Sequence, residues 1–122
     1  MLSIRNSLMA QSIANSLEES KNFHVTSRST LRDIGRECAR NRSDILLMEA
    51  AYGTGFSMED CLKEAEELHY LSPGCRVILL CDENSVPEIA RQVVYAKMDG
   101  LIDDFIYSSV SESYLTALLS AI

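Results

Sequence analysis

The stretches Ile45-Leu46-Leu47-Met48-Glu49 and Val77-Ile78-Leu79-Leu80-Cys81 decide the fold of this 122-residue chain, and Phe105-Ile106-Tyr107-Ser108 repeats their form. Each is a short apolar run that closes in a polar stretch. Continuous apolar runs of this length are typical of parallel strands that are buried on both faces. In open α/β sheets the ligand site lies beyond the carboxyl ends of the strands. A site is therefore expected at the ends of these runs, at Glu49, Cys81 and Ser108.

Amphipathic segments separate the apolar runs along the whole chain. We expect strands at residues 1–4, 23–26, 44–48, 75–80 and 101–107. Helix starts are indicated by capping boxes at Thr30 to Asp33 and Ser85 to Glu88 and by a cap at Ser57 to Asp60. The fourth helix is expected to bury Ile89, Val93 and Val94, and the fifth to bury Leu115, Leu118, Leu119 and Ile122. This alternation predicts an α/β fold of (βα)5 type, a three-layer sandwich with helices on both faces of a parallel sheet.

Length and charge limit the classes of function. With 47% hydrophobic residues, the chain suits a single domain over residues 1–122. Its formal net charge of −7 and its 11 scattered basic residues argue against direct binding of nucleic acid, which needs clustered Lys and Arg. Any contact with DNA would have to come from another chain or another segment.

The cysteines and the N-terminus indicate a cytoplasmic protein. Cys38, Cys61, Cys75 and Cys81 have no CxxC spacing, so reduced core thiols are expected in place of disulfides or a metal site. His24 and His69 have no partner at the spacing of a ligand set or a catalytic triad. Polar residues break the N-terminal segment, which indicates neither a signal peptide nor a membrane span.

Two motifs carry a resemblance to a known family. Ser43-Asp44-Ile45-Leu46-Leu47-Met48-Glu49 and Asp99-Gly100-Leu101-Ile102-Asp103-Asp104-Phe105-Ile106 look like the third-strand and fifth-strand signatures of receiver domains of bacterial two-component response regulators. The resemblance covers essentially all 122 positions and implies a flavodoxin-like fold with strand order 2-1-3-4-5. It is strongest for the subfamily that carries a C-terminal helix-turn-helix, and it leaves open whether a DNA-binding domain follows Ile122.

The phosphorylation pocket that the resemblance implies is degenerate. Active receivers hold Mg²⁺ with an acidic pair after the first strand, phosphorylate an Asp after the third, and use a Ser or Thr and a Lys after the fourth and fifth. The matching positions here are Arg5-Asn6, Glu49, Cys81 and Ser108. A cation at Arg5 opposes Mg²⁺, and without metal and Lys no group stabilises an acyl phosphate. We therefore expect a non-catalytic pseudo-receiver with no metal and no cofactor.

Several alternatives stay open at this stage. The first is that Arg5 and Glu49 form an ion pair in the vacated pocket, against the alternative that both side chains point into water. A second alternative is that Glu49 mimics a phosphorylated state. A third is that the protein is an unorthodox phosphoreceiver, in which Glu49, or Asp44 or Asp82 nearby, accepts phosphate. A different class is a small-molecule-binding protein or a small enzyme on a flavodoxin-like scaffold.

The resemblance also implies an interaction face on the fourth helix, fifth strand and fifth helix. Its candidate residues are Arg91, Tyr95, Phe105, Tyr107 and Tyr114, with Phe105 at the position of the family's switch aromatic. Aromatic residues and Arg are enriched at protein interfaces, so we expect a protein partner or a homodimer there. The plain alternative is that Phe105 belongs to the core and the tyrosines are ordinary surface.

The leading interpretation is a signalling module of transcriptional or other two-component regulation that works through protein contacts without phosphorylation.

Overall fold

The computed structural model describes residues 1–20, 22–51, 55–82 and 87–122 of the chain. In these residues five strands form one parallel sheet of order β2-β1-β3-β4-β5. The strands are β1 (Leu2–Ser3), β2 (Ser27–Arg28), β3 (Ile45–Ala50), β4 (Arg76–Cys81) and β5 (Asp104–Tyr107). The helices are α1 (Ser7–Glu19), α2 (Ile34–Arg40), α3 (Met58–Leu71), α4 (Pro87–Met98) and α5 (Glu112–Ser120). The predicted flavodoxin-like (βα)5 fold and its strand order 2-1-3-4-5 are confirmed.

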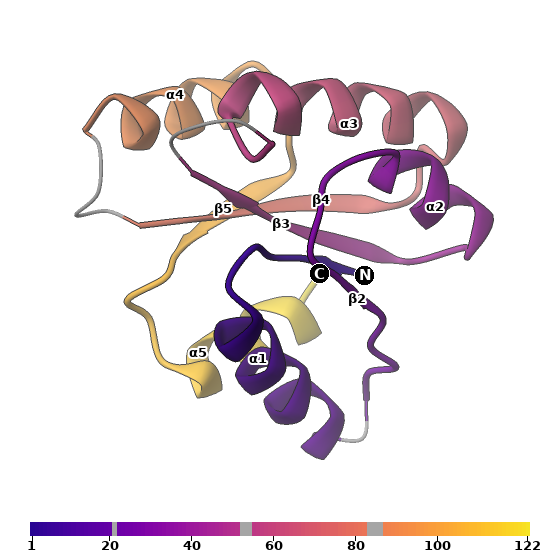
Figure 1. The fold of residues 1–122 in the computed structure, drawn as a ribbon, viewed down its shortest axis with the longest axis vertical. Coiled ribbons are helices and arrows are strands. Elements are labelled where there is room, and N and C mark those ends of the chain that lie inside the picture. Colours follow the sequence, from indigo (N-terminus) through magenta and orange to yellow (C-terminus); the bar gives the residue numbers. More distant parts are fainter. Residues whose placement is uncertain (21, 52–54, 83–86) are drawn as a thin grey trace.

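Helices cover both faces of the sheet. Figure 1 shows α2, α3 and α4 on one face and α1 and α5 on the other. Along β4, Val77 and Leu79 belong to the apolar cluster under α2, α3 and α4, whereas Ile78 and Leu80 belong to the cluster under α1 and α5. The uninterrupted apolar runs of the sequence therefore follow from burial on both sides.

Helix caps form where the sequence indicates them for α3 and α5. Ser57 Oγ accepts a hydrogen bond from the Asp60 N–H at 3.1 Å, and the Asp60 carboxylate accepts one from the Ser57 N–H at 3.4 Å, which completes the capping box. Ser111 Oγ accepts from the Tyr114 N–H in the same way. The capping box expected from Ser85 to Glu88 falls partly outside the described residues.

Two expected boundaries in the first half of the chain are wrong. The second strand pairs with β1 at Ser27–Arg28 and not over residues 23–26, because the Leu2 N–H bonds to the Thr26 carbonyl and the ladder begins there. The capping box expected at Thr30 does not form. Helix α2 starts at Ile34 after Asp33, which has a left-handed backbone (φ 57°) and makes no side-chain cap.

The two central strands extend further than expected. Strand β3 continues through Glu49 to Ala50, and β4 continues to Cys81. Each position is kept in the strand by pairing, Glu49 opposite Leu80 and Ala50 opposite Cys81. Glu49 and Cys81 therefore lie in the last two residues of their strands, at the carboxyl edge of the sheet, and not in loops.

Two residues expected in the core are exposed. Val94 is 37% exposed and Ile122 is 45% exposed. Helix α4 instead buries Ile89, Val93 and Ala96. These residues are four and three positions apart and lie on one helix face, so Val94 points to the outer side.

No helix in the described ranges is long and apolar enough to cross a bilayer. The 14 residues of α3 span about 21 Å, less than the hydrocarbon thickness of about 30 Å.

Helices α2 and α3 pack unusually closely through Gly35 and Glu64. A Cβ at Gly35 would lie 2.6 Å from the Glu64 carbonyl oxygen, so only glycine fits there. The Gly35 N–H donates to Glu64 Oε1 at 3.0 Å, which satisfies a free amide in the first turn of α2. Glu64 is buried, with 8% of its surface exposed. The carboxylate of α3 thus provides the cap that Asp33 does not.

We predict that Gly35→Ala lowers the free energy of unfolding by about 1–3 kcal/mol, because the clash is with backbone that cannot move aside. Helix propensity alone predicts that Ala raises the free energy of unfolding by about 1 kcal/mol. The sign of the measured change therefore tests whether close packing or helix propensity dominates. Urea denaturation measures the effect. Gly74→Ala is the matched control, since a Cβ there meets nothing within 4 Å, and it should be neutral or slightly stabilising. Equal effects at the two glycines would contradict the close approach.

We predict that Glu64→Gln stabilises the protein at pH 7 and not at pH 4. Burial, the largest cause, raises the pKa of the Glu64 carboxyl in the folded protein, and the Gly35 hydrogen bond opposes this only in part. The native state then holds its proton to a higher pH than the unfolded state, so wild-type stability falls as pH rises above about 4.5. Gln keeps an oxygen for the Gly35 N–H and has no charge to bury. Denaturant unfolding of both proteins between pH 4 and pH 7 measures the difference in their free energies of unfolding. A difference that is independent of pH would refute the prediction.

Candidate functional site

The parallel sheet gathers the predicted pocket residues at one edge. Arg5 follows β1, Glu49 lies near the end of β3, Cys81 ends β4 and Ser108 follows β5. The Arg5 N–H donates to Glu49 Oε1 at 2.9 Å, and the Ser108 N–H donates to the Cys81 carbonyl at 2.8 Å. The four positions therefore form two neighbouring pairs at the carboxyl end of the sheet.

The Glu49 carboxylate is held by main chain and not by a guanidinium. Arg5 is exposed, and within the described ranges no ion pair joins its side chain to Glu49. The ion pair, one of the two alternatives left open by the sequence, therefore does not form among the described residues, and Oε1 instead accepts a hydrogen bond from the peptide N–H of Arg5. A peptide donor at this distance orients the carboxylate along the sheet edge and uses one of its acceptor sites.

Asn6, the other residue at the position of the acidic pair, caps a helix. Its Oδ1 accepts from the N–H groups of Leu8 and Met9 at 3.0 and 3.1 Å and so starts α1. The oxygen that a hard metal ion would need is committed to the helix. Across the described part of the chain, no three His, Cys, Asp or Glu side chains lie together in a way that would hold a metal ion.

Two cysteines near this edge, Cys81 of β4 and Cys61 of α3, are buried. Cys81 is 1% exposed and pairs with Ala50 and Tyr107 in the sheet. Burial raises the pKa of the Cys61 thiol to about 12, and the carboxylates of Asp60 and Glu49 act in the same direction. The Cys61 Sγ–H also points at the Glu49 carbonyl, at 3.5 Å. The thiol beside Glu49 is thus in its weakly nucleophilic, neutral form.

The aromatic candidates divide into an exposed and a packed group. Tyr95 and Tyr114 are 57% and 56% exposed. Phe105 and Tyr107 are half-buried and stack edge to face, with ring centroids 5.6 Å apart at an interplanar angle of 74°. Arg91 is exposed on α4.

Lys97, which the sequence did not single out, fixes Phe105. Its Nζ lies 5.7 Å from the centre of the Phe105 ring and 3.0 Å from Asp104 Oδ1. The cation thus lies against both the ring and the carboxylate at the start of β5. The only sequence signal was Lys in the last turn of a helix, which is also typical of plain helix-end electrostatics.

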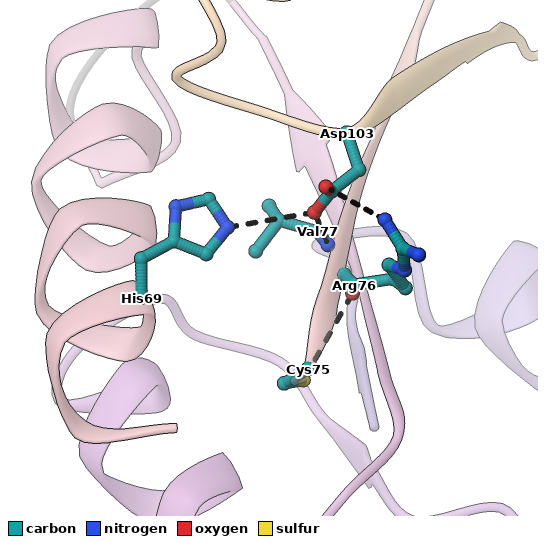
Figure 2. Close-up of polar contacts among 5 residues, drawn as sticks. All are labelled: His69, Cys75, Arg76, Val77 and Asp103. Carbon is teal, nitrogen blue, oxygen red and sulfur yellow. Dashed lines mark hydrogen bonds and ion pairs between the residues drawn. The ribbon is translucent and has the colours of Figure 1, made fainter. Parts of the chain in front are cut away.

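A second polar cluster lies at the opposite, amino end of the sheet. Figure 2 shows the Asp103 carboxylate between His69 of α3 and Arg76 at the start of β4. Asp103 Oδ2 accepts from the Val77 N–H at 2.7 Å, and the Asp103 N–H donates to the Val77 carbonyl at 2.9 Å. His69 and Arg76 each approach the carboxylate to 3.4 Å. His69 therefore has an Asp partner, which the sequence spacing did not reveal because the two residues lie 34 positions apart.

Ser108 also lines a small cavity between α1, α5 and the sheet, with a volume of about 210 Å³. Other lining residues include Tyr107, Leu80 and Val110. This is smaller than the range of about 300–1,000 Å³ that is usual for ligand pockets.

Comparison with known proteins identifies the fold. No protein-family model matches the chain, and a search of curated proteins finds no match. Solved structures match over 98% of the chain. A CheY-like response regulator receiver domain protein from Methanospirillum hungatei JF-1 superposes with a TM-score of 0.72 at 16% identity, over 88% of its length. A response regulator receiver domain protein from Clostridium thermocellum gives 0.75 at 16% identity, over 89% of its length.

A third match comes from a longer protein. A member of a "novel family of redox sensors in the streptococci evolved from two-component response regulators" superposes with a TM-score of 0.79 at 16% identity, and this chain spans 48% of it. Identities at this level establish likeness of fold alone. The chain therefore has the fold of CheY-like response-regulator receiver domains.

We predict that Asp103→Ala lowers the free energy of unfolding by about 1–3 kcal/mol, because it leaves the Val77 N–H without its acceptor. Asp103→Asn keeps an oxygen for that N–H and should cost less, since the exposed Arg76 contributes little. Denaturant unfolding measures both. Asp99→Ala is the control, because it removes an exposed carboxylate that also precedes β5. An equal loss of stability in both Ala variants would contradict the role of Asp103 as the acceptor of the Val77 N–H.

Proposed function

We propose that this chain is a receiver-like signalling module, an atypical response-regulator domain that works through protein contacts without being phosphorylated. The observation that carries the proposal is the hydrogen bond from the Arg5 N–H to the Glu49 carboxylate at 2.9 Å. The group at the position of a phosphoacceptor is here part of the link between β1 and β3.

The donor set at this edge does not suit Mg²⁺. Arg5 places a cation where carboxylates are needed, and the Asn6 oxygen already accepts two helix N–H groups. Ser108 carries no charge in place of the lysine of active receivers. Transfer of a phosphoryl group depends on positioned cations that offset its charge, so these substitutions argue against phosphotransfer.

The exposed aromatic face supports a role in protein contacts. Tyr95 and Tyr114 present large side chains to solvent, and Arg91 lies one turn before Tyr95 on α4. Lys97 lies over the Phe105 ring and is itself paired with Asp104, which favours one position of this aromatic. We propose that a protein partner or a second copy of the chain binds this face.

The same proposal includes the cellular setting. A module of bacterial two-component signalling or transcription regulation works in the cytoplasm, and the net charge of −7 leaves any DNA contact to another domain. The pseudo-receiver character and the kinship with helix-turn-helix regulators are parts of this proposal.

We expect no saturable change in backbone amide NMR shifts when the protein is titrated with Mg²⁺ and beryllofluoride, a mimic of acyl phosphate. The amides to follow are those of Arg5, Glu49, Cys81 and Ser108. An active receiver domain in the same buffer is the positive control. Saturable shifts there that spread to Phe105 and Tyr107, or a phosphate mass gain with acetyl phosphate that Glu49→Gln abolishes, would overturn the proposal and restore an unorthodox phosphoreceiver. A bound small molecule in native mass spectrometry would favour a ligand-binding protein.

A further inference from the structure

An open groove of about 920 Å³ runs between α3 and α4, on the face of the sheet away from α1 and α5. Its floor is apolar. Met58 and Ile89 are buried at its base, and Leu62 lies half-buried beside them. Tyr95 and Leu101 stand at its side with 57% and 47% of their surface exposed.

The lining residues form one stripe on each helix. On α3 the groove is lined at positions 58, 59, 62, 63, 66 and 69, and on α4 at positions 88, 89, 92, 95 and 96, with Asp99 just after the end of α4. Spacings of three and four place each set on a single helix face. The 12 residues of α4 span about 18 Å, so the groove matches about three turns of a helix laid along it.

The rim of the groove is acidic. Glu59 and Glu66 lie on the α3 side, and Glu88 and Asp99 lie on the α4 side. All four are exposed, and none has an ion-pair partner among the residues that the structure describes. Lys63 is the cationic residue on the same rim, and His69 is engaged by Asp103.

From this geometry we propose that the α3–α4 groove binds an amphipathic helix of a partner protein, with an apolar face flanked on both sides by Lys or Arg. An apolar stripe fills the floor made by Met58, Leu62 and Ile89, which is the usual way a helix occupies a groove. Basic residues on both flanks meet the carboxylates of the two helices, and this charge match selects a basic helix over an acidic one. The inference goes beyond the proposed function and holds whether or not the Glu49 edge is phosphorylated.

Three synthetic peptides of about 14 residues test the groove. The first has Leu at helical spacing with Lys on both flanks, the second has Glu in place of Lys, and the third is the Lys peptide with a central Pro that breaks the helix. Fluorescence anisotropy measures affinity, and amide NMR shifts locate the site. We expect saturable binding of the Lys peptide, with shifts on α3 and α4 around Leu62 and Tyr95, and at least about tenfold weaker binding of the other two.

Matched charge reversals separate the groove from general attraction to an acidic protein. Glu59→Lys with Glu66→Lys changes the α3 rim, and Glu18→Lys with Glu19→Lys makes the same change of net charge on exposed residues of α1. We expect the α3 pair to weaken binding of the Lys peptide by at least about tenfold and the α1 pair to change it much less. Circular dichroism confirms that both variants fold.

Any of three results would overturn the proposal. These are no saturable binding of the Lys peptide, an equal effect of the α1 and α3 reversals, and shifts that map away from α3 and α4. Tyr95 belongs to both surfaces, so the groove is identified by shifts around Leu62 and by the effect of the α3 variants. These variants leave Tyr114 and the Glu49 edge intact, so failure here is distinguishable from failure of the proposed function.

Discussion

Burial of β3 and β4 on both faces is the constraint on which the rest of the structure depends. Side chains of these strands alternate between two apolar clusters, so neither strand has a face on which a polar group would be solvated. Polar chemistry is therefore confined to the two ends of the strands. The carboxyl end holds Glu49 and Ser108, and the amino end holds Asp103 with His69 and Arg76.

Three carboxylates use the same solution to connect elements at the margins of this core. Glu49 accepts from the N–H of Arg5, Asp103 accepts from the N–H of Val77, and Glu64 accepts from the N–H of Gly35. In each case the donor belongs to a different element, so the bond fixes the distance between two elements as well as satisfying an amide. Glu49 is thus one of a set of structural links, which gives a physical reason for a carboxylate at this position without phosphate chemistry.

The sequence predicted what depends on local pattern and missed what depends on distant partners. The strands around Leu47 and Leu79 were predictable because burial on both faces leaves a continuous apolar run. The cap at Ser57 was predictable because its partner is three residues away. The start of α2 was not, because its cap is Glu64, 29 residues further along the chain. The pocket residues were placed at the correct edge, but the donor to Glu49 is a main-chain N–H, which has no signature in the side-chain pattern.

The size of the facing side chains explains why α2 packs closely against α3 whereas a groove stays open between α3 and α4. Gly35 lets α2 approach α3 until backbone nearly touches backbone, and the Glu64 carboxylate bridges the pair. Between α3 and α4 the facing residues are large, with Leu62 on one side and Tyr95 on the other, so the helices cannot close in the same way. The contrast therefore comes from side-chain size, because α2 presents Gly35 to α3 whereas α4 presents Tyr95. It leaves apolar surface open beside rim carboxylates that have no ion-pair partner among the described residues.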